Sequence, residues 1–192
     1  MFNDIKSMRK FLKFLLKLAG WKIDEFVPQG VDKCVVVMGP HTSNWDFIIG
    51  RITFANYGVN AKFLIKKELF FFPMGLILKK MGGIPVDRKT NNNLTDFAAK
   101  LLGQYSSMYL VFTPEGTRSY NDKWKKGFYY IAQRAQVPIY LAYIDYEKKI
   151  GGFECLFEPT GDVNEDIKII KKILSKYKGK FPEKGIKDPY ES

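Results

Sequence analysis

Hydrophobic positions along the chain form short apolar runs that alternate with longer segments of helical spacing. The apolar runs at residues 32–38, 61–65, 84–86, 108–113, 137–143 and 153–157 predict strands. Apolar positions three and four residues apart predict helices over 45–57, 91–104, 127–134 and 163–177. This alternation, in a chain of 192 residues, predicts a single layered α/β domain with a largely parallel central sheet flanked by helices.

Two stretches do not fit this simple alternation. The segment from Leu69 to Met81 is strongly apolar, and Pro73 inside it is suited to the first turn of a helix. Such a segment belongs to the core, lines a groove for an acyl chain or dips into lipid, and the pattern does not separate these options. The tail from Lys178 is rich in Lys, Pro and Gly, and we expect it to lie on the surface or to fray.

The N-terminus has the pattern of a basic amphipathic helix over residues 3–20. Residues 1–22 carry six basic side chains and one acidic side chain, with Phe and Leu on the other face. This combination suits a helix that lies in a membrane interface, although a helix packed on its own domain with its lysines in water is the alternative. We therefore divide the chain into a membrane-interface helix at 1–22 and a folded domain at 23–192.

The composition limits where the protein acts and what it binds. No run approaches the roughly 20 apolar residues that span a bilayer, and the N-terminus lacks the pattern of a signal peptide, so we expect a peripheral or monotopic protein at the cytoplasmic face of a membrane. The net charge of +11 predicts an anionic partner such as a membrane surface. Nucleic acid is disfavoured because the basic residues concentrate at the two ends without a recognised motif. One histidine and two isolated cysteines suit neither a metal site nor a disulfide framework, and we expect no cofactor.

Candidate chemistry begins at the only histidine, His41. It follows the strand at 32–38 after a Gly-Pro turn, and Asp46 comes after four intervening residues, where the next helix begins. If residues 42–46 form the first helical turn, the carboxylate can hold one imidazole nitrogen and leave the other free to take a proton. A structural histidine, with Asp46 favouring the helix N-terminus, is the alternative. No serine or cysteine nucleophile stands beside this pair, which suggests that the nucleophile belongs to the substrate.

Two further polar clusters follow predicted strands. Arg88 follows the strand at 84–86 and can grip a phosphate with two hydrogen bonds, or can pair with a neighbouring acid. Glu115 opens the second cluster and can bind a substrate hydroxyl or hold Arg88. Because ligands of open α/β sheets bind beyond the carboxyl ends of the strands, we expect these clusters and His41 to form one site.

The second cluster continues with a small residue, a hydroxyl and a cation. Gly116 permits a positive φ and a close approach of the backbone to a ligand. Thr117 can donate to a phosphate or an oxyanion, and Arg118 adds positive charge. A turn without function is the alternative for this stretch.

These motifs resemble those of the glycerolipid acyltransferase family, which includes the lysophosphatidic acid acyltransferases. Residues 41–46 match the family's first block, a histidine and an aspartate separated by four residues. Residues 83–88 resemble its second block, and residues 112–119 match the third, Phe-Pro-Glu-Gly-Thr-Arg-Ser, with Thr113 inserted after Phe. Residues 137–139 resemble the fourth. Pro40 departs from the pattern, since many members have Asn before the histidine.

The resemblance implies that the domain at 23–192 is an acyltransferase domain. It also implies that the acyl group passes directly from donor to acceptor, without a covalent acyl-enzyme intermediate. His41 would act as general base on an acceptor hydroxyl, oriented by Asp46, and the hydroxyl would attack the thioester of acyl-CoA or acyl-carrier protein. The acceptor, a lysophospholipid or a glycerol-phosphate-type molecule, would be held by five residues: Arg88, Glu115, Gly116, Thr117 and Arg118. A lyso-aminolipid acceptor, a non-catalytic membrane-associated lipid binder and a thioester hydrolase stay open as alternatives.

Overall fold

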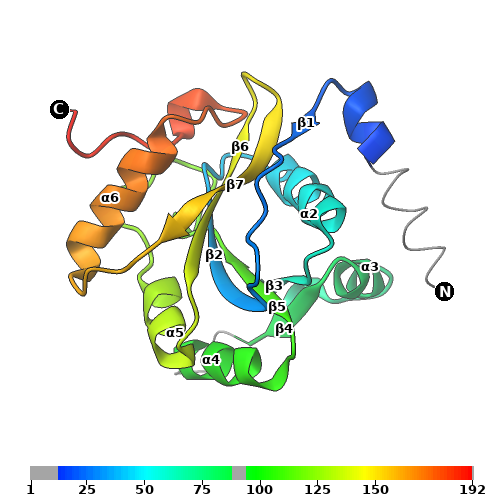
Figure 1. Cartoon of the computed structure of the whole chain (residues 1–192). Helices are drawn as coiled ribbons and strands as arrows, with labels where there is room; N and C mark the ends of the chain where they lie inside the picture. Colours follow the sequence, from blue (N-terminus) through cyan, green and yellow to red (C-terminus); the bar gives the residue numbers. More distant parts are fainter. Residues whose placement is uncertain (1–12, 88–93, 192) are drawn as a thin grey trace.

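The computed structural model describes residues 13–87 and 94–191, which form one α/β domain around a central sheet (Figure 1). Within these residues the sheet has seven strands in the order β1-β7-β6-β2-β5-β3-β4. All neighbouring strands pair in parallel except β6 and β7, which are antiparallel. The strands are β1 (Lys22–Ile23), β2 (Lys33–Gly39), β3 (Ala61–Lys66), β4 (Gly83–Val86), β5 (Met108–Phe112), β6 (Ile139–Asp145) and β7 (Ile150–Phe157).

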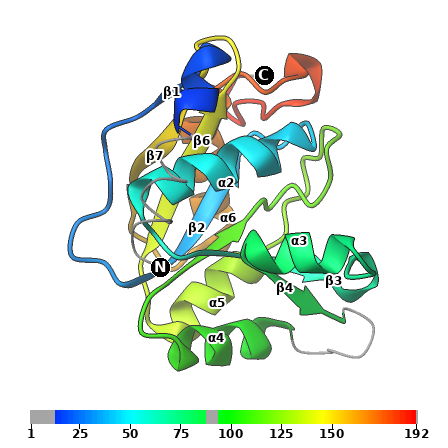
Figure 2. The same ribbon diagram turned by 90° about the vertical axis from the view of Figure 1, so that its right-hand side faces the viewer.

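The helices cover both faces of this sheet. The α-helices are α2 (Trp45–Tyr57), α3 (Met74–Lys80), α4 (Leu94–Gln104), α5 (Gly127–Ala135) and α6 (Val163–Ser175). Two short 3₁₀ turns are η1 (Lys67–Leu69) and η2 (Pro182–Lys184). Figures 1 and 2 show α2 and α3 on one side of the sheet and α4, α5 and α6 on the other.

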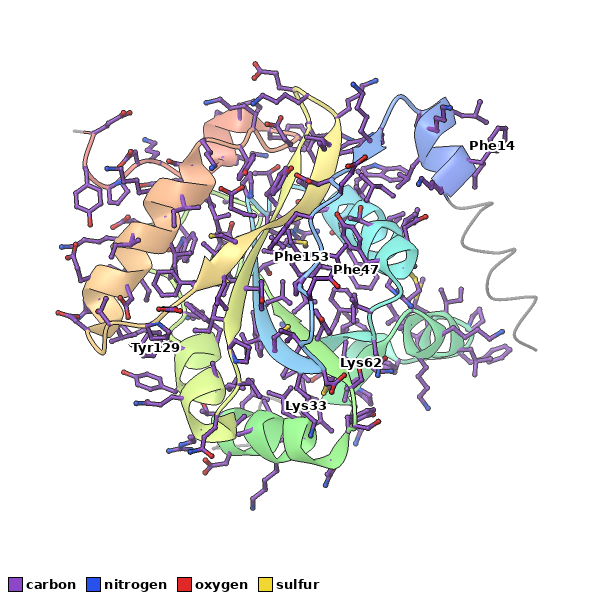
Figure 3. All side chains as sticks on the ribbon, viewed as in Figure 1. Phe14, Lys33, Phe47, Lys62, Tyr129 and Phe153 are labelled. Carbon is purple, nitrogen blue, oxygen red and sulfur yellow. The ribbon has the colours of Figure 1, made fainter. Side chains whose placement is uncertain are left out.

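The central strand β2 is buried on both faces, because its side chains point alternately to the two helix layers. Val35 and Val37 are fully buried in the core shared with α4, α5 and α6. Cys34 and Val36 are fully buried in the core beneath α2. Figure 3 shows Phe153 in that second layer, between the sheet and α2. An uninterrupted apolar run is what a strand between two helix layers requires.

The predicted fold class, a single α/β domain with a largely parallel sheet, is confirmed. The helix predicted over residues 45–57 has those bounds, and it ends at Gly58, which adopts a left-handed conformation with φ of 79°. The strand predicted at 153–157 begins earlier, at Ile150, and the strand predicted at 137–143 continues to Asp145. These two strands extend because each provides the hydrogen-bonding edge for the other.

The described part of the N-terminal region begins with a helical turn at residues 13–18. Leu16 is buried against the domain, whereas Phe14 and Leu18 are exposed, and Figure 3 shows Phe14 at the periphery of the molecule. The first twelve residues of the predicted membrane-interface helix lie outside the described residues. Over residues 13–87 and 94–191, the helices are too short or too polar to cross a membrane.

The C-terminal tail lies on the surface as predicted, but it is held against the turn that carries His41. The backbone N–H of Tyr146 donates to the carbonyl of Lys178 over 2.8 Å, and that of Phe181 donates to Thr42 Oγ1 over 3.3 Å. Gly179 is buried against Thr42, where a β-carbon would approach the hydroxyl oxygen to 2.6 Å. The tail is therefore one wall of the candidate site, and only glycine fits at this contact.

Candidate active site

The candidate site lies at the carboxyl edge of three adjacent strands. The strands β6, β2 and β5 are neighbours in the sheet and run parallel. Tyr146 follows β6, His41 follows β2 after a single intervening residue, and Glu115 follows β5. Because strands in a sheet lie about 4.8 Å apart, the three chain segments leave the sheet side by side. This is the edge at which open α/β sheets bind ligands.

The predicted pairing of His41 and Asp46 is present. Nδ1 of His41 lies 3.1 Å from Oδ2 of Asp46. The imidazole is 22% exposed, whereas the carboxylate is fully buried. A carboxylate only accepts hydrogen bonds, so Nδ1 carries the hydrogen and Nε2 is left to accept a proton. The pair therefore has the arrangement of a general base with its orienting acid.

Asp46 is kept ionised by an unusually complete set of donors. Oδ2 also accepts the backbone N–H groups of Thr42 and Ser43, each over 2.8 Å. Oδ1 accepts the hydroxyl of Tyr146 over 2.7 Å. Burial pushes the pKa of Asp46 upward, but the hydrogen bonds from His41, Tyr146 and Ser43 outweigh it and lower the pKa below its ordinary value. The carboxylate also lies in the first turn of α2, where the helix favours a negative charge.

Tyr146 is a site residue that the sequence analysis missed. It stands one residue beyond β6, and the rule that singled out His41, a polar residue at the carboxyl end of a central strand, could have found it. Its ring packs edge-on against Trp21 with centroids 5.0 Å apart. Burial and the hydrogen bond to Asp46 raise the pKa of its hydroxyl, so the hydroxyl remains a donor. The side chain therefore holds Asp46 from the side opposite His41.

Glu115 lies beneath the turn at residues 40–44 that carries His41, which we call the catalytic turn, rather than at the surface. Its Oε1 accepts the backbone N–H of His41 over 2.9 Å, and the side chain is almost completely buried. Its Oε2 is buried and has no hydrogen-bond partner among the described residues. Burial raises the pKa of Glu115 to about 7, although the backbone N–H groups of Glu115 and His41 act in the opposite direction. This carboxyl group thus supports the position of His41 through Oε1.

The other predicted binding residues are only partly brought together. Gly116 has a φ of 68°, the left-handed conformation that the sequence suggested. Thr117 and Arg118 are exposed, and the Arg118 guanidinium donates to the side-chain oxygen of Asn44 in the catalytic turn. Arg88 lies outside the described residues. The contact between Arg118 and Asn44 therefore joins the 115–118 turn to the His41 turn and places an exposed positive charge beside it.

Replacing Tyr146 by phenylalanine is expected to lower kcat by about three- to tenfold, because Asp46 keeps its hydrogen bonds from His41 and from two backbone N–H groups but loses that from the tyrosine hydroxyl. Tyr109→Phe is the matched control, since Tyr109 also donates from a half-buried hydroxyl, to the Val31 carbonyl over 2.6 Å, at the opposite edge of the sheet. In both variants the free energy of unfolding, measured by urea denaturation, should be lower than in the wild type by about 1–2 kcal/mol. Only the Tyr146 variant should lose kcat, and equal kcat values for the two variants would contradict a positioning role.

Replacing Glu115 by glutamine is expected to change how stability depends on pH. Because burial raises the pKa of Glu115 to about 7, its contribution to stability is full below its unfolded pKa near 4.5 and is lost as pH rises through about 7. The wild type should therefore lose about 3 kcal/mol relative to Glu115→Gln between pH 4.5 and 8. Urea denaturation at several pH values measures this difference. The control, replacement of the exposed Glu183 by glutamine, should follow the wild type, and a parallel Glu115→Gln curve would show that Glu115 is ionised in the folded protein.

The residues described do not form a metal site. In residues 13–87 and 94–191, no group of three or more His, Cys, Asp or Glu side chains is arranged to hold a metal ion. Both cysteines are free thiols, and burial raises the pKa of each.

Comparisons with known proteins agree with this geometry. The crystal structure of the 1-acyl-sn-glycerophosphate (LPA) acyltransferase PlsC from Thermotoga maritima is similar with a TM-score of 0.63 at 18% sequence identity, over 88% of this chain and 76% of that one. At this identity the likeness establishes the fold. Comparison with curated proteins gives no match. The model of the family described as Acyltransferase matches residues 22–145, which is more than half of the chain. The resemblance to glycerolipid acyltransferases is thus confirmed, and the chain belongs to the acyltransferase family.

Proposed function

We propose that this acyltransferase moves a fatty acyl group from acyl-CoA or acyl-carrier protein to a hydroxyl of a lysophospholipid or glycerol-phosphate-type acceptor. The observation that carries the proposal is the contact of His41 Nδ1 with the buried Asp46 carboxylate, at the exposed edge of the sheet. A base oriented in this way suits removal of a proton from an acceptor hydroxyl.

In the proposed reaction, Nε2 of His41 takes the proton of the acceptor hydroxyl as its oxygen attacks the thioester carbonyl. The Asp46 carboxylate stabilises the imidazolium that forms. Collapse of the tetrahedral intermediate breaks the carbon–sulfur bond. The protonated His41 then gives its proton to the leaving thiolate. The products are an ester and a free thiol, so no bond to the enzyme is made.

Direct transfer is supported by the state of the side chains that might otherwise act as nucleophiles. Cys34 is fully buried in β2, and burial raises its pKa far above neutrality. Cys155 lies on β7, and its pKa is also raised, chiefly by burial. The Ser43 hydroxyl oxygen accepts the backbone N–H of Trp45 at the start of α2. The substrate's own hydroxyl is then the best nucleophile available.

The exposed turn at residues 116–118 suits the polar head of the acceptor. Arg118 supplies a positive charge beside the catalytic turn, and Thr117 supplies a hydroxyl. We include Arg88 in this proposal on the strength of the sequence motif alone. Glu115 takes part indirectly in this proposal, because its buried side chain accepts the backbone N–H of His41. The net charge of +11 supports an anionic membrane surface at the cytoplasmic face as the source of the acceptor.

The proposal is tested by acyl transfer with the purified full chain. Radiolabelled acyl-CoA and acyl-carrier protein are supplied in parallel, with anionic vesicles that contain lysophosphatidic acid, other lysophospholipids or a lyso-aminolipid. We expect a labelled diacyl product with at least one phosphate-bearing acceptor. A product formed only with the lyso-aminolipid would reassign the acceptor.

Two other outcomes of the same assay would overturn the proposal. Loss of the thioester with release of free fatty acid, independent of any acceptor, would identify a hydrolase. Tight binding to vesicles without turnover of either donor would identify a lipid-binding protein that has kept the fold. The exposed apolar residues described below make the second outcome a real alternative.

A further inference from the structure

A surface of exposed apolar side chains lies on the segment between β3 and β4. Within residues 69–77, six large apolar side chains are exposed: Leu69, Phe71, Phe72, Met74, Leu76 and Ile77. We call these six the α3 surface. Phe72 is 82% exposed and Phe71 is 60% exposed, so neither belongs to the core. Exposed apolar patches of this density mark sites of interaction in soluble domains.

The α3 surface is bordered by positive charge. Lys66 and Lys67 precede it, Lys79 and Lys80 follow it, and all four are exposed. Glu68 is the only acid among residues 66–80. Apolar side chains surrounded by lysines match the layers of a bilayer surface, in which acyl chains lie beneath anionic head groups. A second copy of the chain would instead bring like charges together, because each copy carries +11.

Two other elements on the same side of the sheet, α2 and the helical turn at 13–18, also carry exposed apolar residues. Trp45 is 54% exposed and Ile48 is 39% exposed on α2. Phe14 and Leu18 are exposed on the helical turn at 13–18. Figure 2 views the molecule from the side that presents all three elements, and Figure 1 has them on the same side of the sheet. A partner approaching from that side of the molecule would face all three elements.

The position of the α3 surface relative to His41 gives it a role. Phe71 and Phe72 follow β3, and His41 follows β2, so both leave the same edge of the parallel sheet. Only β5 separates the two strands, which corresponds to about 10 Å. Trp45, the first residue of α2, lies between the catalytic turn and the rest of that helix. A bilayer against these residues would meet the edge of the sheet at which His41 is exposed.

We infer that the α3 surface, together with Trp45 and Ile48, docks this domain on an anionic lipid bilayer with His41 facing the head groups. The inference rests on the proposed function for its purpose, since a docked enzyme can accept a lyso-lipid that stays in the membrane. Its physical basis is separate: burial of exposed aromatic rings in the interface and attraction of the four lysines to lipid phosphates.

Vesicle co-sedimentation of the full chain tests the inference without any acyl donor or acceptor. Vesicles of phosphatidylcholine are compared with vesicles that also contain phosphatidylglycerol. The double variant Phe71→Ser with Phe72→Ser should bind both at least about tenfold more weakly than wild type. Lys79→Gln with Lys80→Gln should lose about tenfold only on the anionic vesicles. Unchanged circular dichroism and melting temperature verify that both variants fold.

The matched control is Leu156→Ser. Leu156 is 44% exposed on β7, which lies four strands from β3 in the sheet, a distance of about 19 Å. This variant should bind vesicles as the wild type does. Binding of the double phenylalanine variant at the wild-type level, or an equal loss in the control, would overturn the inference. So would a dimer in solution that the double variant converts to a monomer without any change in vesicle binding.

Activity measurements separate this inference from the proposed function. The double phenylalanine variant should transfer acyl groups normally to a short-chain acceptor dissolved as monomers, and at least about fivefold more slowly to a lyso-lipid embedded in vesicles. If no acceptor is acylated but binding depends on Phe71 and Phe72, the docking surface stands and the proposed function fails. If transfer occurs but vesicle binding does not depend on these residues, the proposed function stands and the docking surface fails.

Discussion

Replacement of His41 by alanine should lower kcat for acyl transfer by about 100-fold to 10 000-fold, which is the usual contribution of a positioned general base. The fold should survive, because Glu115 accepts the backbone N–H of His41 and not its side chain. The loss should appear in kcat with little change in KM, since the exposed 116–118 turn that we assign to the acceptor is untouched. Steady-state rates with the acceptor that the transfer assay selects measure both constants.

Chemical rescue sharpens this experiment. Imidazole added to His41→Ala should restore part of the lost rate, because the cavity left by the side chain lies at the exposed edge of the site. The added base should not affect the wild type. A variant that keeps its rate within a few-fold of wild type would exclude His41 as the base, and the histidine would then be structural.

Asp46→Asn is expected to lower kcat by about 100-fold or more while the structure is largely kept. The asparagine oxygen can still accept the N–H groups of Thr42 and Ser43, and its amide can donate to Tyr146, whose hydroxyl can turn to accept. What disappears is the negative charge that stabilises the imidazolium of His41. The variant thus tests the charge of the carboxylate separately from its geometry.

Asp166→Asn is a close control for this substitution. Asp166 is also fully buried in the first turn of a helix, and it accepts a tyrosine hydroxyl, from Tyr129, and a backbone N–H, from Thr160. It has no contact with His41, so Asp166→Asn should lower stability without lowering kcat. Equal kcat values for the two variants would refute the role of Asp46.

The lowered pKa of Asp46 adds a pH dependence to the same comparison. Stability contributed by a carboxylate with a lowered pKa is present above its ordinary pKa, near 4, and is lost as pH falls through the folded value. The wild type should therefore lose stability below about pH 4 more steeply than Asp46→Asn. Acid denaturation curves of the two proteins, recorded side by side, measure the difference.

Much of the fold could be predicted from the sequence because its signals are local. The run at residues 34–38 is apolar without interruption, which suits a strand covered on both faces, and β2 has that position. The helix at 45–57 has its left-handed glycine at the end. The antiparallel pairing of β7 with β6 was not predicted, because pairing depends on contacts between segments and not on periodicity within one.

The apolar segment after β3 illustrates the same limit. Its composition permitted core, an acyl groove or lipid contact, and the exposure of Phe71 and Phe72 removes the first option. Exposure follows from how α3 lies on β4 and β3, which no pattern within residues 69–81 encodes. The tail from Lys178 was likewise expected only on the surface, whereas it contacts Thr42.

The sequence by itself determined the fold class, through the alternation of strand and helix patterns, and the family, through its motifs. It also determined the pair of His41 and Asp46, because their short spacing brings the two side chains together. Only the tertiary structure decided the rest of the site. Tyr146 reaches Asp46 and Glu115 reaches His41 across 100 and 74 residues of chain. Those contacts exist because β6, β2 and β5 are neighbours in a parallel sheet and end at one edge. Strand order is set by the packing of the whole domain, and so the sequence pattern of any one segment cannot reveal it.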